Sequence, residues 1–353
     1  MTSAPVISVL LPAWNAAAFL GQAVQSILRQ TFANFELLIL DDGSTDITWT
    51  AALGYTDPRV RVLRNERNLG LTATLNRGLR EACGEFIARQ DADDTSHPNR
   101  FAEQIAFLRA HPRVVLLGTG GEQVSETGRS LGRLRVPGDP LAIRWAMPWD
   151  NPFLHTSVMF RREVVLKQFG GYDGAYRISQ DYALWQRIAE VHPTANLPES
   201  LVTLQVHGAS LMRSRGGELD AETARIRTAA LQALAPGRKW SPREQALMAG
   251  FRSKIAPEHL PEFWRLWQEI CGLFASKHPA AAGSREVCAA QAAGIARVGY
   301  NLLPEARWAA IQVIARAVRL SPGVAWELPW PRVAALVLLG PFARRLHGWL
   351  GGA

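Results

Sequence analysis

The chain has 353 residues, of which 48% are hydrophobic and 20% charged, and its formal net charge is +8. These proportions are those of a globular protein with a sizeable core, so they exclude a chain that is disordered over long regions. Its three cysteines, Cys83, Cys271 and Cys288, are odd in number and far apart. That spacing excludes a disulfide scaffold and a cysteine-based zinc site, and it fits a reducing compartment.

Strand-like and helical patterns alternate along the first 118 residues. Continuous apolar runs predict strands and one-sided apolar spacing predicts helices: strands over 6–12, 35–42, 60–63, 85–90 and 114–118, and helices over 19–30, 71–82 and 98–110. Buried strands that alternate with helices predict an α/β fold, with a mostly parallel sheet covered on both faces. Short strands and turns follow, and then a helix over 179–190.

The composition changes near residue 211. Residues 211–353 contain 19 basic and 10 acidic side chains and seven of the 12 tryptophans, whereas the first 210 residues contain 20 basic and 21 acidic side chains. Helical patterns recur in the basic part, over 221–233, 257–274, 284–296, 304–320 and 341–353. We therefore expect one domain over residues 1–212 and a basic, tryptophan-rich helical region over residues 213–353.

Polar clusters follow three of the predicted strands at their carboxyl ends. They are Pro12-Ala13-Trp14-Asn15, Asp41-Asp42-Gly43-Ser44 and Asp91-Ala92-Asp93-Asp94. In open α/β sheets, ligands bind beyond the carboxyl ends of the strands. Neighbouring carboxylates raise one another's pKa unless a positive charge neutralises them. The third cluster therefore indicates a bound cation or a cationic partner.

A helix cap is the simplest role for such residues. On this interpretation Ser44 or Thr45 caps one helix, and Asp94 or Thr95 caps the helix that follows the acids. A calcium loop does not fit, because the pattern counted from Asp91 lacks glycine at its sixth position and glutamate at its twelfth.

Two catalytic interpretations remain for the same acids. The pattern Asp-x-Asp-x-Thr resembles the first motif of haloacid-dehalogenase-type phosphatases, with Asp91 as nucleophile and Asp93 as acid/base, although that motif usually follows the first strand and here follows the fourth. Alternatively, the site binds a nucleoside diphosphate. Asp91 would then accept hydrogen bonds from ribose hydroxyls and Asp93 would hold Mg²⁺ or Mn²⁺, whose charge relieves the repulsion between the acids.

Four segments together resemble a known family. VISVLLPAWN, FELLILDDGSTD, NLGLTATLNRGLREACGEFIARQDADD and SQDYALWQRIA occur in the order and at about the spacing of inverting family 2 glycosyltransferases. The resemblance covers roughly residues 5–210. It implies a GT-A fold, which is Rossmann-like, for residues 1–212, with a nucleotide-binding half over 5–118 and an acceptor half over 119–212.

The resemblance also implies roles for individual residues. The nucleotide-sugar site would comprise Pro12, Ala13, Asn15, Asp41, Asp42, Asn68, Gly70, Asp91 and Ala92, with Asn76 and Arg77 on the helix that follows Gly70. Asp93 would bind Mn²⁺ or Mg²⁺, His207 would complete the metal shell, and His155 would line the acceptor pocket. Asp181 matches the catalytic base. Most relatives carry an acid before that base, and Gln180 here leaves open how the base is oriented.

The implied function is inverting, metal-assisted transfer of a sugar from a nucleotide-diphosphate sugar to a glycan or lipid-linked acceptor, in cell-envelope or surface polysaccharide biosynthesis. Two alternatives stay open: the phosphatase that uses Asp91 as nucleophile, and a catalytically degenerate GT-A binding module, of which Gln180 would be the sign. Metal-dependent release of a nucleoside diphosphate would separate the first function from both.

The expected location is the cytoplasm, with possible peripheral contact at the inner face of the cell membrane. The N-terminus lacks the basic stretch of a signal peptide, and the apolar run over 333–340 is shorter than the roughly 20 residues that span a bilayer. The basic helices of the C-terminal region fit either a membrane interface or packing against the rest of the chain. No nucleic-acid-binding motif is present, so nucleic acid is not an expected partner.

Overall fold

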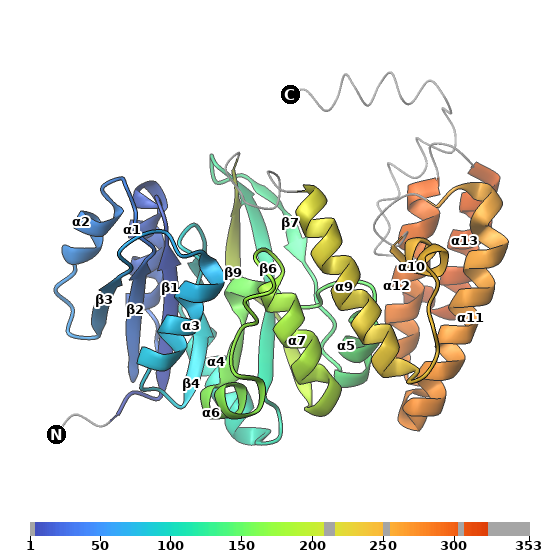
Figure 1. Cartoon of the computed structure of the whole chain (residues 1–353), viewed down its shortest axis with the longest axis horizontal. Helices are drawn as coiled ribbons and strands as arrows, with labels where there is room; N and C mark the ends of the chain where they lie inside the picture. The colour runs from blue at the N-terminus through green and yellow to red at the C-terminus, as the bar shows by residue number, and fades with distance from the viewer. Residues whose placement is uncertain (1–3, 208–215, 250–254, 303–306, 324–353) are drawn as a thin grey trace. The chain divides into compact units, whose positions relative to one another are not determined.

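The structure is a computed structural model that describes residues 4–207, 216–249, 255–302 and 307–323 (Figure 1). The chain forms two compact units. The first consists of residues up to 143 together with 151–226, and the second of residues 144–150 together with those from 227 onward. The division lies inside helix α9 (Gly216–Leu234), which begins after the division expected at residue 212.

The first unit is built on a nine-stranded sheet in the order β3-β2-β1-β4-β8-β6-β9-β5, with β7 paired to β6 beside this path. The strands are β1 (Ile7–Ala13), β2 (Phe35–Asp41), β3 (Val60–Arg64), β4 (Phe86–Arg89), β5 (Thr95–Ser96), β6 (Leu116–Ser125), β7 (Ser130–Leu134), β8 (Met159–Arg161) and β9 (Thr194–Val206). The helices are α1 (Ala17–Leu28), α2 (Thr48–Leu53), α3 (Leu71–Glu81), α4 (Arg100–Ala110), the first part of α5 (Pro140–Ala146), α6 (Arg162–Val164), α7 (Gln180–Val191) and the first part of α9. The expected α/β architecture is confirmed, and each of the five predicted strands overlaps an observed one.

Strands β3, β2, β1 and β4 are parallel and are covered on both faces (Figure 1, blue to cyan). On one face, Val9 and Leu11 of β1 belong to a core that includes residues of α1 and α4. On the other face α3 approaches closely, since a Cβ added to Gly78 would lie 2.6 Å from Leu40 and 3.0 Å from Leu10. Burial on both faces explains why these strands read as continuous apolar runs.

The other half of the sheet is mixed. Strand β8 is antiparallel to β4 and β6, while β9 is parallel to β6 and antiparallel to β5. The expectation of a mostly parallel sheet is therefore correct for the first four strands only. Strand β8 has only three residues, and β9 is exposed at Pro198 and Glu199. Neither strand therefore has the long apolar run from which a buried strand can be predicted. Through its pairing with β5, β9 brings the chain back to the acid cluster.

The second unit is helical in its described part. It contains the end of α9 together with α10 (Pro242–Ala249), α11 (Leu260–Lys277), α12 (Arg285–Leu302) and α13 (Arg307–Leu320). Its core is aromatic: the ring of Trp145 lies 5.1 Å from that of Trp267 and 5.2 Å from that of Phe274, between centroids. The helical C-terminal region is thus confirmed for the described residues, and the helix expected over 341–353 lies outside them. None of the described helices is both long and apolar enough to cross a bilayer.

Candidate active site

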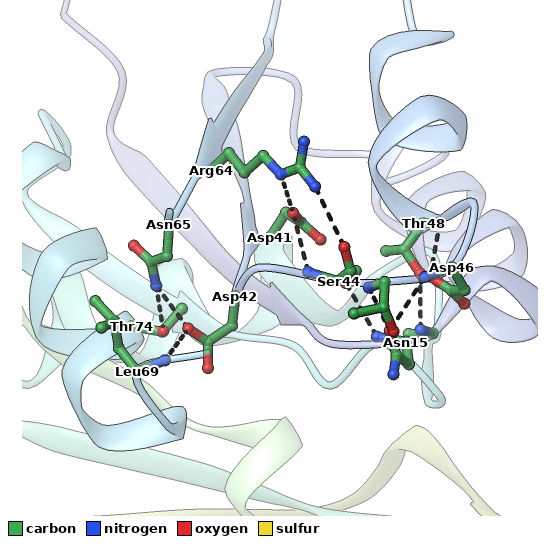
Figure 2. A network of polar contacts seen from close by, with 12 residues as sticks. Asn15, Asp41, Asp42, Ser44, Asp46, Thr48, Arg64, Asn65, Leu69 and Thr74 are labelled. Carbon is green, nitrogen blue, oxygen red and sulfur yellow. Dashed lines mark hydrogen bonds and ion pairs between the residues drawn. The ribbon is translucent and has the colours of Figure 1, made fainter. Parts of the chain in front are cut away.

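Asp42 organises the loops at the carboxyl ends of β2 and β3 (Figure 2). It is 4% exposed, and its Oδ1 accepts hydrogen bonds from Asn65 Nδ2 at 2.7 Å and from the N–H of Leu69 at 2.9 Å. Its Oδ2 accepts the N–H of Gly70 at 2.9 Å, and Asn68 Oδ1 accepts the same N–H at 3.0 Å. Gly70 has a φ of 89°, which side chains other than glycine rarely adopt. The structure therefore joins three predicted nucleotide-site residues in one network.

Asn15 ties the loop after β1 to the loop after β2 (Figure 2). Its φ of 49° is unusual for a residue other than glycine. Its side-chain Oδ1 accepts the N–H of Thr45 at 2.9 Å, and its own N–H donates to Ser44 Oγ at 3.0 Å. Ser44 and Thr45 are consequently loop ties, and the expectation that either caps a helix is wrong. At the start of α2 the N–H of Thr48 instead donates to Asp46, at 2.9 Å.

Asp41 carries a buried side-chain oxygen that has no hydrogen-bond partner among the described residues. Asp41 is 1% exposed, and its Oδ2 lies 3.1 Å from Arg64 Nε (Figure 2). Its Oδ1 is buried and has no hydrogen-bond partner among the described residues. A buried acceptor without a partner costs about 1–3 kcal/mol, so a donor from a ligand or from water suits this position. Pro12 and Ala13 lie alongside in β1, where Ala13 is in register with Asp41.

Asp91 is held in its charged form by buried arginine. Arg89 is fully buried, and its Nη2 lies 2.5 Å from Asp91 Oδ1. Burial opposes ionisation of Asp91, but the positive charges around it, Arg89 first, outweigh burial and lower its pKa. Arg100 is also fully buried, and burial followed by repulsion from Arg89 lowers its pKa to about 9. No motif in the sequence marks Arg89, so its role could not be predicted.

Asp93 and His207 meet although they are 114 residues apart in the chain. Their Oδ2 and Nε2 atoms are 2.9 Å apart, and the His207 ring stacks on Phe19 with 4.7 Å between centroids. Burial and then the nearby charge of Asp91 raise the pKa of Asp93. A partly exposed carboxylate, an imidazole and an excess of negative charge are a donor set that suits a divalent cation such as Mn²⁺.

Asp94 does not cap the helix after the acids. Its Oδ1 accepts the N–H of Gln205 in β9 at 3.1 Å, while α4 begins after Asn99 without any side-chain cap. Thr95 pairs in β5 with Thr203 of β9. The cap interpretation of the acid cluster is therefore wrong, because the Asp94 side chain and the Thr95 backbone pair with β9 and not with the start of α4. Burial and the charges of the neighbouring acids raise the pKa of Asp94 well above its usual range.

Asp181 is the second residue of α7 and is held from outside that helix. Asn151 Nδ2 donates a hydrogen bond of 2.9 Å to Asp181 Oδ2. Gln180, the residue before the candidate base, is only 1% exposed. Its side chain is therefore buried in the core. Asn151 was not singled out in the sequence, where an asparagine before a proline reads as a turn.

His155 is influenced by the charges of both Asp91 and Asp181. Burial and then the charge of Arg89 lower its pKa, and the negative charges of Asp181 and Asp91 oppose that shift. Its Nε2 is buried without a hydrogen-bond partner in the described part of the chain, and its ring lies 6.2 Å from that of Tyr172. The structure thus places His155 within electrostatic reach of both acids.

The chain is similar in sequence to known glycosyltransferases. Residues 8–169 match the family model described as glycosyl transferase family 2. The putative glycosyltransferase EpsE of Bacillus subtilis is 35% identical over 199 residues, which cover 54% of this chain and 69% of that protein. The chain belongs to glycosyl transferase family 2. The O-antigen biosynthesis glycosyltransferase WbnJ of Escherichia coli is 32% identical over 214 residues, 59% of this chain and 83% of WbnJ.

Solved glycosyltransferase structures share the fold. Residues 1–349 of Staphylococcus aureus TarS, in complex with UDP-GlcNAc, align over 91% of this chain and 92% of that chain, with a TM-score of 0.55 and 16% identity. The mannosyltransferase PcManGT of Pyrobaculum calidifontis, in complex with GDP-Man and Mn²⁺, aligns over 92% and 88% with a TM-score of 0.54 and 20% identity. The expected GT-A fold is confirmed. This protein is a glycosyltransferase, which removes the phosphatase interpretation of Asp91.

Proposed function

We propose that this glycosyltransferase moves a sugar from a nucleoside-diphosphate sugar to an acceptor hydroxyl with inversion at the anomeric carbon. The observation that carries the proposal is the contact of 2.9 Å between Asp93 Oδ2 and His207 Nε2, which joins the acid cluster after β4 to the end of β9 in a donor set that suits a divalent cation and its diphosphate. The charges of Asp91 and Asp181 both act on His155, which supports its proposed place in the acceptor pocket.

The donor nucleotide is proposed to lie along the carboxyl ends of β1, β2 and β4. The unpartnered Oδ1 of Asp41 is available to a donor group of the base, and the loop built on Asp42 supplies a rigid wall. Asp91, kept ionised by Arg89, is suited to accept hydrogen bonds from the ribose hydroxyls. Carboxylates that accept from neutral hydroxyls make stronger hydrogen bonds than neutral acceptors do.

Asp93 and His207 are the proposed protein ligands of a divalent cation. Within the described residues no group of three acidic, histidine or cysteine side chains could hold a metal, so the diphosphate and water would complete its shell. Mn²⁺ or Mg²⁺, when bound, would neutralise charge that develops on the leaving diphosphate. The complex of PcManGT with GDP-Man and Mn²⁺ supports this choice of ion.

Asp181 is the proposed general base. It would accept the proton of the acceptor hydroxyl as that oxygen attacks the anomeric carbon, and the Asn151 amide would hold the receiving carboxylate in place. A retaining mechanism would need a second carboxylate as nucleophile. Asp91 is paired with Arg89 and Asp93 with His207, so neither is free for that role among the described acids.

The acceptor is proposed to be a glycan or a lipid-linked sugar in cell-envelope or surface polysaccharide biosynthesis. The names of WbnJ and of the amylovoran biosynthesis glycosyltransferase AmsE of Erwinia amylovora support this setting. One face of α13 would contact the inner membrane surface: Trp308, Ile311 and Leu320 are 81%, 36% and 38% exposed, and Arg316 and Arg319 are exposed beside them. Exposed tryptophan with arginine suits an anionic interface.

Nucleotide binding can be tested by titrating the purified protein with a panel of nucleoside diphosphates, each with and without Mn²⁺, while its thermal unfolding is followed. A ligand at 100 times its dissociation constant stabilises the folded state by about 2.7 kcal/mol. We expect one nucleotide to raise the unfolding temperature only with metal, and Asp93→Ala to remove that effect. Stabilisation that is equal without metal, or unchanged in Asp93→Ala, would contradict the proposed metal site.

A further inference from the structure

The loop that leads into α7 is anchored by α3. Asn76 donates from Nδ2 to the carbonyl of Tyr172 at 2.8 Å and accepts the N–H of Tyr172 on Oδ1 at 2.9 Å. Thr72 Oγ1, one turn earlier on α3, donates to the carbonyl of Tyr176 at 2.8 Å. Because α3 begins at the loop built on Asp42, this anchor connects the nucleotide loop to the segment before the candidate base.

Helix α9 anchors the other end of the same loop. The Glu222 carboxylate accepts the N–H groups of Arg177, Ile178 and Ser179, at 2.7, 3.1 and 2.7 Å. Glu222 is 6% exposed; burial opposes its ionisation, but the three backbone donors outweigh burial and lower its pKa. Arg225, three residues later on α9, lies over the ring of Tyr176 at 4.6 Å.

These bonds hold the segment that leads into α7, because the three N–H groups belong to residues 177–179, the last of which immediately precedes the helix. The residue before the helix, Ser179, makes no side-chain cap bond of its own. The first N–H groups of any helix have no partner inside it, and a carboxylate there is favoured both by hydrogen bonds and by the helix dipole. Glu222 supplies a carboxylate from a separate helix to the N–H of Ser179, the residue before α7, so it fixes the point from which the first turn of α7 begins. Asp181 is part of that turn.

We propose that Glu222 is a positioning residue for the catalytic base. By fixing the first turn of α7 it would set the Asp181 carboxylate against Asn151, where the bond is 2.9 Å long. This rests on the proposed role of Asp181 as base. It also accounts for Gln180: with its side chain buried, the orientation of the base is set by Asn151 from one side and by Glu222 through the backbone.

The test compares Glu222→Ala and Glu222→Gln with Asp220→Ala, which removes an exposed carboxylate from the same helix. Donor turnover, with water as acceptor, and donor affinity are both measured on the folded protein. We expect Glu222→Ala to lower kcat about 10- to 100-fold with little change in donor Kd, since misplacement of a reacting group by about 1 Å costs up to about 10²-fold. Glu222→Gln keeps an acceptor oxygen and should recover part of the loss, and Asp220→Ala should match the wild type.

A double variant identifies the residue through which Glu222 acts. If Glu222 acts through Asp181, adding Glu222→Ala to Asp181→Asn should cause no further loss of turnover, because the two effects then share one cause. An unchanged kcat in Glu222→Ala, an equal loss of donor affinity, or a full additional loss in the double variant would each overturn the positioning role. If Asp181→Asn itself stays active, the proposed base is wrong, which is a separate result.

Discussion

In the first unit charged side chains gather at the carboxyl ends of the strands, whereas in the second they pair along the helices. Asp41, Asp42 and Asp91 are each held by donors from other segments, and Asp41 keeps an oxygen without a partner among the described residues. In the second unit Arg238 is bound by Glu244 and Glu269, at 2.8 and 2.6 Å. A functional site therefore differs from a surface stabilised by ion pairs mainly in two ways: its charged groups are buried, and some of their hydrogen-bonding atoms have no protein partner. The number of charges matters less.

Tryptophan shows the same contrast within the second unit. Trp145 and Trp267 are 2% and 5% exposed and form its core, while Trp308 on α13 is 81% exposed. A basic, tryptophan-rich composition therefore covers two different roles. Only the exposed residues are suited to contact a membrane, and the buried ones stabilise the helical unit. The predictions below test this division, from the largest expected effect to the smallest.

The first prediction separates binding from chemistry within the first unit. Asp181→Asn should reduce turnover by about 10²–10⁴-fold, the usual contribution of a general base, while donor affinity stays nearly unchanged. Initial rates of nucleoside diphosphate release and donor titration by calorimetry would measure the two quantities. Arg187→Gln, on the far part of the same helix, is the control. Equal losses of affinity and rate would show that Asp181 belongs with the nucleotide residues.

The second prediction concerns the two classes of tryptophan. Trp267→Ala should lower the free energy of unfolding by about 3–5 kcal/mol, because it opens a cavity between the rings of Trp145 and Trp149. Trp308→Ala should change it by less than about 0.5 kcal/mol, as is usual at exposed positions. Urea unfolding followed by circular dichroism measures both. A costly Trp308→Ala would mean that α13 is covered in solution.

The third prediction tests the outer face of α13. Replacing Arg316 and Arg319 by glutamine should weaken binding to vesicles that contain anionic lipid by roughly 30-fold, since each basic residue near such a surface contributes about 1 kcal/mol. The matched control removes two exposed arginines from the first unit, Arg109 and Arg113. Co-sedimentation with anionic and with neutral vesicles measures the fraction of protein that is bound to each. An equal loss in the control would show that only total charge matters.

The fourth prediction concerns a buried acid that is structural. Glu36 accepts Ser8 Oγ at 2.6 Å and the N–H of Cys83 at 2.7 Å, and its Oε2 lies 2.7 Å from Arg61. Burial opposes its ionisation, but these partners outweigh burial and lower its pKa below 4.5. The stabilisation is therefore complete above about pH 4.5 and is lost as the pH falls through the lower folded value.

Glu36→Gln should accordingly destabilise the protein by about 1 kcal/mol at pH 7, the typical net contribution of a hydrogen bond, and by less as the pH falls through the folded pKa of Glu36. Donor affinity at pH 7 should stay unchanged. Unfolding curves of both proteins at several pH values measure the difference. A difference that grows toward low pH would contradict the assigned direction of the pKa shift.

Much of the nucleotide side could be predicted from the sequence by itself. Strands β1, β2 and β4 are apolar because both of their faces are buried; Asp42 directly follows β2, and Asp91 comes two residues after the end of β4. An open α/β sheet places such chain segments at one edge, so local sequence was sufficient to bring them together. The four quoted segments also predicted the family, and the comparisons confirmed it. This prediction was possible because each of the family's motifs is continuous in the chain.

The tertiary structure decided the contacts that orient those residues. Asn151 reaches Asp181 across 30 residues, Glu222 reaches Ser179 across 43 and His207 reaches Asp93 across 114. The last contact depends on the register of β9 against β5, and β9 had no recognisable pattern. The role of Arg89 depends on its burial beside Asp91, which the sequence pattern does not show. Local sequence determines which groups are present, and long-range packing determines which of their hydrogen bonds are met, because each partner comes from a different segment.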